Sequence, residues 1–154
     1  MFNGIRNYWN FLPDMALAHI LLRIPLAVVF ITQGINKLPF DPAAASAFGV
    51  ITLVWWVVVY GEIAAGIGLL VGAVPTFPVL KDIPVLAELG DVITRLSGIG
   101  MCCILTGIIW VVLKPASLWD FILYDNLHLF LWVGGLYFAL RGNWAVAVNK
   151  VSLQ

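Results

Sequence analysis

Long runs of hydrophobic residues, separated by short polar or proline-containing segments, dominate the sequence. A membrane-spanning helix needs about 20 mostly apolar residues. Four runs approach or reach that length, and they cover residues 15–36, 50–73, 96–113 and 118–140. Because these runs use most of the 154 residues, no separate soluble domain is expected. The pattern predicts an all-α integral membrane four-helix bundle, with residues 1–154 forming a single transmembrane domain.

The segments between these runs predict short helices at the membrane surface. In residues 84–95 the apolar side chains repeat at helical spacing, and Glu88, Asp91 and Arg95 lie elsewhere on the helix. This pattern is typical of an interfacial helix. Ser117-x-x-Asp120 has the spacing of a capping box and predicts the start of the fourth span. We therefore expect four spans accompanied by short interfacial helices.

Composition supports a membrane protein. Hydrophobic residues make up 62% of the chain, charged residues 10%, and the mean hydropathy is +1.02. A soluble domain of this size could not bury so much apolar surface. The formal net charge is zero and no basic run is present, so nucleic-acid binding is not expected. The two cysteines, Cys102 and Cys103, point about 100° apart on a helix, so we expect neither a disulfide nor thiol chemistry.

The distribution of lysine and arginine predicts the orientation of the bundle. With four spans, both termini lie on the same side, and this side carries Arg6, Lys81, Arg95, Arg141 and Lys150. The opposite side carries Lys37 and Lys114. The positive-inside rule therefore predicts that both termini are cytoplasmic.

Two residues of opposite charge interrupt the apolar spans at similar predicted depth, Arg23 in the first and Glu62 in the second. An ionised side chain near the bilayer centre costs roughly 2.5–3.5 kcal/mol on insertion scales, so it needs a partner. We expect Arg23 and Glu62 to contact each other. Helix two carries a stripe of small residues, Gly61, Ala65, Gly68 and Gly72, that would let helices one and two approach closely. Whether the pair is a structural contact or part of a binding site is left open.

Other polar residues fall on the same predicted inward faces. His19, Arg23, Gln33 and Lys37 occupy positions of a seven-residue repeat that forms the seam of a helix bundle, and Lys37 is expected to extend to the membrane surface. Asp125 and His128 share one face of helix four. The candidate binding site is thus a polar intramembrane core of His19, Arg23, Gln33, Glu62, Asp125 and His128. Neither a catalytic motif nor a metal site is predicted.

Three segments resemble one known family. They are Leu22-Arg23 with Phe30 and Gly34-x-x-Lys37-Leu38, then Glu62 within GEIAAGIGLLVG, and finally LHLFLWVGGLYFALRGN. The chain resembles the DoxX family in these segments. This resemblance implies a four-helix bundle in the bacterial inner membrane, and the family includes a quinone-linked subunit of a thiosulfate-oxidising system. Many members have His where this chain has Gln33.

These observations lead to an expected function. The chain is expected to be a small subunit or accessory factor of a quinone-linked membrane redox complex, rather than a stand-alone enzyme. Its polar core would bind a quinone head or a small anion, and no covalently bound cofactor is expected. Its expected partners are membrane lipids and a larger membrane protein complex. The alternative is a purely structural subunit that packs against larger membrane proteins and lipids without chemistry of its own.

Overall fold

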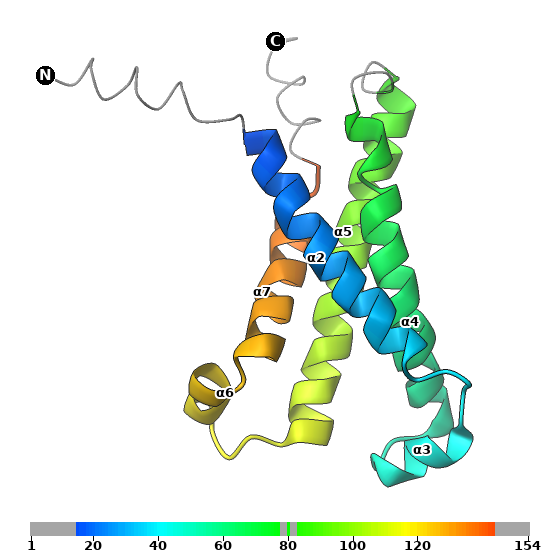
Figure 1. The fold of residues 1–154 in the computed structure, drawn as a ribbon, viewed down its shortest axis with the longest axis vertical. Helices are drawn as coiled ribbons and strands as arrows, with labels where there is room; N and C mark the ends of the chain where they lie inside the picture. The colour runs from blue at the N-terminus through cyan, green and yellow to red at the C-terminus, as the bar shows by residue number, and fades with distance from the viewer. Residues whose placement is uncertain (1–14, 78–79, 81–82, 144–154) are drawn as a thin grey trace, which may run out of the picture.

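The computed structural model describes residues 15–77, 80 and 83–143, and within these residues every regular element is a helix (Figure 1). The four longest helices are α2 (Met15–Ile35), α4 (Thr52–Val71), α5 (Pro84–Gly107) and α7 (Asn126–Arg141). The short elements are α3 (Pro42–Ala47), the 3-10 helix η1 (Val74–Thr76), the π-helix η2 (Ile108–Leu113) and α6 (Leu118–Tyr124). The predicted all-α fold is therefore confirmed for the part of the chain that is described.

The long helices pack in the order α2, α4, α5 and α7, and α2 and α7 share only a few contacts. In Figure 1, α2 crosses in front of α5, from the end near α7 toward α4. At the lower end, α3 and α6 lie on opposite sides of the molecule. A buried core that includes Leu26, Phe30, Leu69, Met101 and Phe138 fills the space between the long helices.

Glycines permit the closest helix contacts. A Cβ atom added to Gly66 of α4 would lie 2.8 Å from the carbonyl oxygen of Ala27 in α2, too close for any side chain. Gly68 and Gly72 instead face Ser97 and Thr94 of α5. The predicted stripe of small residues thus serves the contact between α4 and α5, and the expectation that it joins the first two helices is wrong.

Residues 84–95 do not form a separate interfacial helix, because they continue into the third span as one rod from Pro84 to Leu113. Pro84 lies in the first turn, where proline is tolerated, and no proline follows it in the rod. Asp91 and Arg95, which suggested a surface helix, bond to each other at 2.7 Å and to groups at the end of α7. Their polarity is therefore satisfied within the protein.

The fourth apolar run also differs from the prediction, because α6 and α7 meet at an angle of 98°. The predicted helix start at Ser117 is confirmed, since Ser117 Oγ accepts a hydrogen bond from the backbone N–H of Asp120 at 3.1 Å. A second cap at Asp125 starts a new helix, α7, because its side chain accepts from the backbone N–H of His128. Residues 118–140 are thus two helices rather than one.

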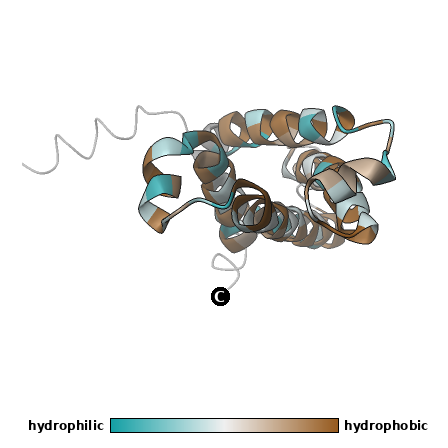
Figure 2. Cartoon of the chain, turned by 90° about the horizontal axis from the view of Figure 1, so that it is seen from below, coloured by the Kyte–Doolittle hydropathy of each residue, from teal (hydrophilic) through white to brown (hydrophobic). Residues whose placement is uncertain are grey.

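Length and composition support two or three membrane spans among the described residues. Thr52–Thr76 and Pro84–Leu113 are each long and apolar enough to cross a membrane, and the bent α6–α7 pair could form a third span. The apolar part of α2, His19–Ile35, is shorter. Large apolar side chains such as Leu53, Leu96 and Phe130 are exposed, and hydrophobic residues extend over most of the ribbon in Figure 2. Surfaces of this kind suit contact with lipid.

Candidate functional site

Arg23 and Glu62 do not contact each other, so the expected intramembrane pair is wrong. Each residue is only 3% exposed, but the two belong to separate polar clusters. Arg23 donates to the carbonyl oxygen of Leu69 at 2.6 Å, to Thr94 Oγ1 at 3.1 Å and to Asn143 Oδ1 at 2.7 Å. Among the described residues its hydrogen-bond partners are therefore neutral oxygens.

The Arg23 cluster completes the C-terminal end of α4. The last carbonyls of a helix lack intrahelical partners and carry partial negative charge, and Arg23 binds one of them, that of Leu69. Asn143 Nδ2 donates to the neighbouring carbonyl of Gly72 at 2.6 Å. We call Arg23, Thr94, Asn143 and these two carbonyls the Arg23 hub. It joins α2, α4 and α5 to the chain just beyond α7, which makes it a structural element.

Glu62 forms the second cluster with Lys37. The ammonium Nζ of Lys37 lies 2.5 Å from Glu62 Oε2 and also donates to the carbonyl of Gln33 at 3.2 Å. Lys37 follows the C-terminal end of α2, and its side chain is 21% exposed against 4% for Glu62. The lysine therefore supplies the countercharge that a buried carboxylate requires, instead of extending freely to the membrane surface as expected.

His128 and Asp125 form a third polar pair at the start of α7. The ring atom Nδ1 of His128 lies 2.7 Å from Asp125 Oδ1, and the two side chains are about one-quarter exposed. The same carboxylate caps the helix, so cap and imidazole are fixed together. Since the carboxylate accepts, Nδ1 carries a proton, and in the Nδ1–H tautomer Nε2 is an acceptor.

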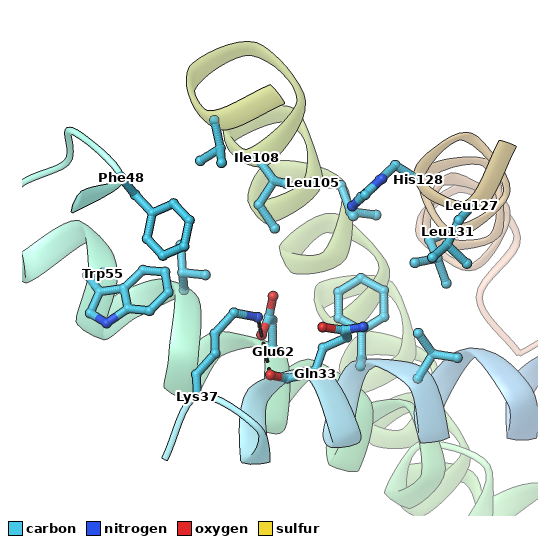
Figure 3. Close-up of a pocket in the computed structure, with 14 residues that line it drawn as sticks. Gln33, Lys37, Phe48, Trp55, Glu62, Leu105, Ile108, Leu127, His128 and Leu131 are labelled. Atoms are coloured by element: carbon cyan, nitrogen blue, oxygen red, sulfur yellow. Dashed lines mark hydrogen bonds and ion pairs between the residues drawn. The ribbon is translucent and has the colours of Figure 1, made fainter. Parts of the chain in front are cut away.

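The second and third clusters face one pocket of about 190 Å³, shown in Figure 3. The His128 ring reaches from α7 toward its interior, and Gln33 and the Lys37–Glu62 pair approach from α2 and α4. The remaining walls are apolar. They consist of Val29, Phe30, Phe48, Trp55, Val58, Leu105, Ile108, Val112, Leu127 and Leu131. A few polar groups on mostly apolar walls are typical of a small-molecule site.

The structure therefore divides the predicted polar core. Glu62, Gln33 and His128 line the pocket, and Asp125 orients His128 from behind. Arg23 does not line it, and neither does His19, whose ring packs against Tyr137 and Phe138 with centroids 5.2 Å apart.

Part of the Arg23 hub and part of the Lys37–Glu62 cluster were not predicted from the sequence. Lys37 lay on the predicted seam but was assigned to the membrane surface, and its seven-residue spacing from Phe30 was the available signal. Thr94 and Asn143 carried no spacing that linked them to Arg23, because they lie 71 and 120 residues away. The aromatic wall of Phe48 and Trp55, with ring centroids 5.0 Å apart, depends on how α3 folds back onto α4.

Neither cysteine takes part in this site. Cys102 is partly buried, with Sγ 3.6 Å from the carbonyl of Trp132, and Cys103 is exposed. They form no disulfide. Within the described residues no group of three His, Cys, Asp or Glu side chains could hold a metal ion.

Comparison with known proteins identifies one family. The family model described as DoxX matches residues 18–80, which contain Lys37 and Glu62, whereas His128 lies outside the match. No curated protein and no solved structure matches the chain. The match covers the first two segments on which the resemblance rested, and it supports the assignment of this chain to the DoxX family.

Proposed function

We propose that this chain binds the ring of a quinone-type ligand in the pocket between Glu62 and His128. In this proposal the chain is an integral protein of the bacterial inner membrane, with four spans and cytoplasmic termini. It acts as a small accessory subunit of a membrane redox complex rather than as a stand-alone enzyme. The family match and the apolar helices support a membrane protein, and the distribution of Lys and Arg supports the orientation.

The pocket is the observation that carries this proposal. Its volume is about 190 Å³, and an apolar cavity of about 150 Å³ is known to hold one benzene molecule. A single substituted six-membered ring therefore fits, whereas most drug-sized ligands occupy larger sites of about 300–1,000 Å³. The apolar walls match the faces of such a ring, and polar groups stand where its oxygens would lie.

The residues present suit a quinone ring in particular. When bound, such a ring can carry electrons together with protons. Lys37 just beyond α2, Glu62 of α4 and His128 of α7 provide hydrogen-bonding groups from different parts of the chain, so they can fix the orientation of the ring. Leu127 and Leu131 of α7 and Val29 of α2 line the side on which these two helices share few contacts. An apolar tail would leave the pocket between α2 and α7, toward lipid.

The proposed binding is tested with protein reconstituted in lipid nanodiscs. Calorimetric titration with trimethylbenzoquinone and with trimethylhydroquinone should detect saturable binding of at least one of them. Ile108 lines the pocket, so the larger side chain of Ile108→Trp should fill the cavity and abolish ligand binding. Ile99→Trp is the matched control, because Ile99 lies on the same helical rod with 48% exposure and does not line the pocket. Binding of neither compound, or equal binding by Ile108→Trp, would refute the proposed ligand.

The accessory role has a separate test. Extraction from the native membrane in a mild detergent should yield a large, stable assembly that contains this chain. If the chain forms that assembly but binds neither ring compound, the alternative of a purely structural subunit is favoured. If it is extracted alone, the accessory role is wrong.

A further inference from the structure

We infer that the pocket is built for the reduced, dihydroxy form of the ring and selects it over the oxidised, dicarbonyl form. This inference rests on the proposed function and adds which oxidation state the site prefers. The two forms have nearly the same size and shape, but a hydroxyl can donate a hydrogen bond and a carbonyl oxygen cannot. The selection therefore depends on whether the pocket offers acceptors or donors.

Glu62 offers an acceptor on one side of the pocket. Its Oε2 accepts from Lys37, whereas Oε1 has no hydrogen-bond donor among the residues that the structure describes. The residue is 3% exposed, and it lines the pocket. This second carboxylate oxygen is free to accept a hydrogen bond at the pocket wall, and a hydroxyl of the ligand would supply the donor. A carbonyl oxygen in the same place would instead face the carboxylate with its lone pairs.

His128 offers a second acceptor from α7. Its Nδ1–H is used by Asp125 at 2.7 Å, so the neutral ring presents the unprotonated Nε2 at its tip. Figure 3 shows that the ring points into the pocket. The two acceptors come from different helices, so a ring with a hydroxyl at each end could donate to both.

The other polar groups of the pocket are Lys37, Gln33 and the indole N–H of Trp55, which is buried without a hydrogen-bond partner among the described residues. An N–H can donate to a hydroxyl oxygen as well as to a carbonyl oxygen, so the indole does not reverse this preference. Lys37 has one proton left after its bonds to Glu62 and to the Gln33 carbonyl, and a hydroxyl can accept that proton while it donates to Glu62. A carbonyl could only accept. The side-chain amide of Gln33 can both donate and accept, so it favours neither form.

The decisive measurement compares trimethylhydroquinone and trimethylbenzoquinone, titrated anaerobically into the protein in nanodiscs. We expect the hydroquinone to bind more tightly, by about tenfold or more, because a hydrogen bond to a charged acceptor is among the strong ones. Equal affinity, or tighter binding of the benzoquinone, would overturn this inference and leave the proposed function intact. If neither compound binds, both are refuted.

Two variants test the acceptors one at a time. Glu62→Gln keeps an oxygen for Lys37 and should reduce the preference for the hydroquinone by about tenfold. His128→Phe keeps a ring but removes Nε2, and should reduce it by roughly fivefold. His19→Phe is the matched control, since His19 lies outside the pocket among aromatic rings. This variant should prefer the hydroquinone over the benzoquinone as strongly as the wild type does. If the preference is unchanged in both pocket variants, the assigned acceptors are wrong.

Discussion

Lys37 Nζ and Glu62 Oε2 lie 2.5 Å apart and link the end of α2 to the middle of α4. The carboxylate is almost completely buried, whereas the ammonium group is partly exposed. The lysine therefore neutralises an internal charge from the edge of the pocket.

Lys37→Met should destabilise the protein, because it leaves the Glu62 carboxylate buried without a countercharge. Breaking a buried ion pair costs about 3–5 kcal/mol, and the partial exposure of Lys37 places this case at the lower end of that range. The free energy of unfolding can be measured by denaturant titration in mixed micelles. The double variant Lys37→Met with Glu62→Met should recover much of the loss. A double variant that is no more stable than Lys37→Met would contradict this account.

Arg23 and Glu62 should behave as independent sites. Arg23→Met leaves the Leu69 carbonyl without this donor and leaves the Asn143 amide oxygen with Thr94 as its donor, so we expect a loss of about 3 kcal/mol. Combined with Glu62→Gln, the two effects on unfolding should add within about 0.5 kcal/mol. A larger coupling in this double-mutant cycle would revive direct contact between the two residues. Arg23→Lys should recover only part of the loss, because an ammonium group lacks the planar fork of donors.

Gly98→Ala should be strongly destabilising, by about 1–3 kcal/mol, through overpacking. The added Cβ would lie 2.5 Å from the carbonyl oxygen of Gly135 in α7, and a backbone atom cannot move away cheaply. Gly107→Ala is the matched control in the same helix, since no atom lies within 4 Å of its added Cβ. It should be neutral or stabilising by up to about 1 kcal/mol. Similar losses in both variants would show that close contact between α5 and α7 is not the cause.

Asp125 has two roles, because its side chain caps α7 and also contacts the ring of His128. Asp125→Ser should keep the first role and remove the second. Serine is also a good N-cap, but its shorter side chain does not reach the imidazole. We expect stability close to that of the wild type and a clear loss of the preference for trimethylhydroquinone, because the tautomer of His128 is no longer fixed. Asp120→Ser, at the start of α6 and away from the pocket, controls for the loss of a carboxylate. An unchanged preference in Asp125→Ser would show that Asp125 does not orient the ring.

The proposed orientation can be tested by cysteine labelling in a background that carries Cys102→Ala and Cys103→Ala. Ser46→Cys in α3 should react with a membrane-impermeant reagent added from the periplasm. Leu80→Cys, between α4 and α5, should react only after the membrane is opened. In Figure 1, α3 lies at the lower end of the molecule, whereas α4 ends and α5 begins at the upper end. The reverse labelling pattern would invert the topology.

The sequence predicted the helices well, because their signals are local. Apolar runs gave the positions of the long helices, and Ser117 with Asp120 gave a helix start that the structure contains. The sequence did not predict that residues 84–95 continue into the third span. Polar side chains on one face of a helix can bond either to water or to other parts of the protein, and the sequence pattern is the same in both cases. The bend at Asp125 involves neither proline nor glycine. Its local signal in the sequence was Asp125 itself, whose side chain caps α7 by accepting from the backbone N–H of His128.

Partners across the bundle could not be predicted in the same way. Residue spacing gives the depth of a side chain along its helix but not the tilt of that helix against its neighbours. Arg23 and Glu62 therefore looked like partners. The lysine beyond the end of α2 reaches Glu62 instead, and Arg23 finds the end of α4.

The Arg23 hub also has a mechanical consequence. It ties α2, α4 and α5 together near one end of the molecule, and the Lys37–Glu62 pair ties the other end of α2 to α4. These two attachments are separated by the stretch of α2 from Arg23 to Ile35, about 18 Å at 1.5 Å per residue. A helix fastened at both ends cannot turn about one attachment without breaking the bonds of the other, so the pocket wall formed by α2 keeps its position relative to α4.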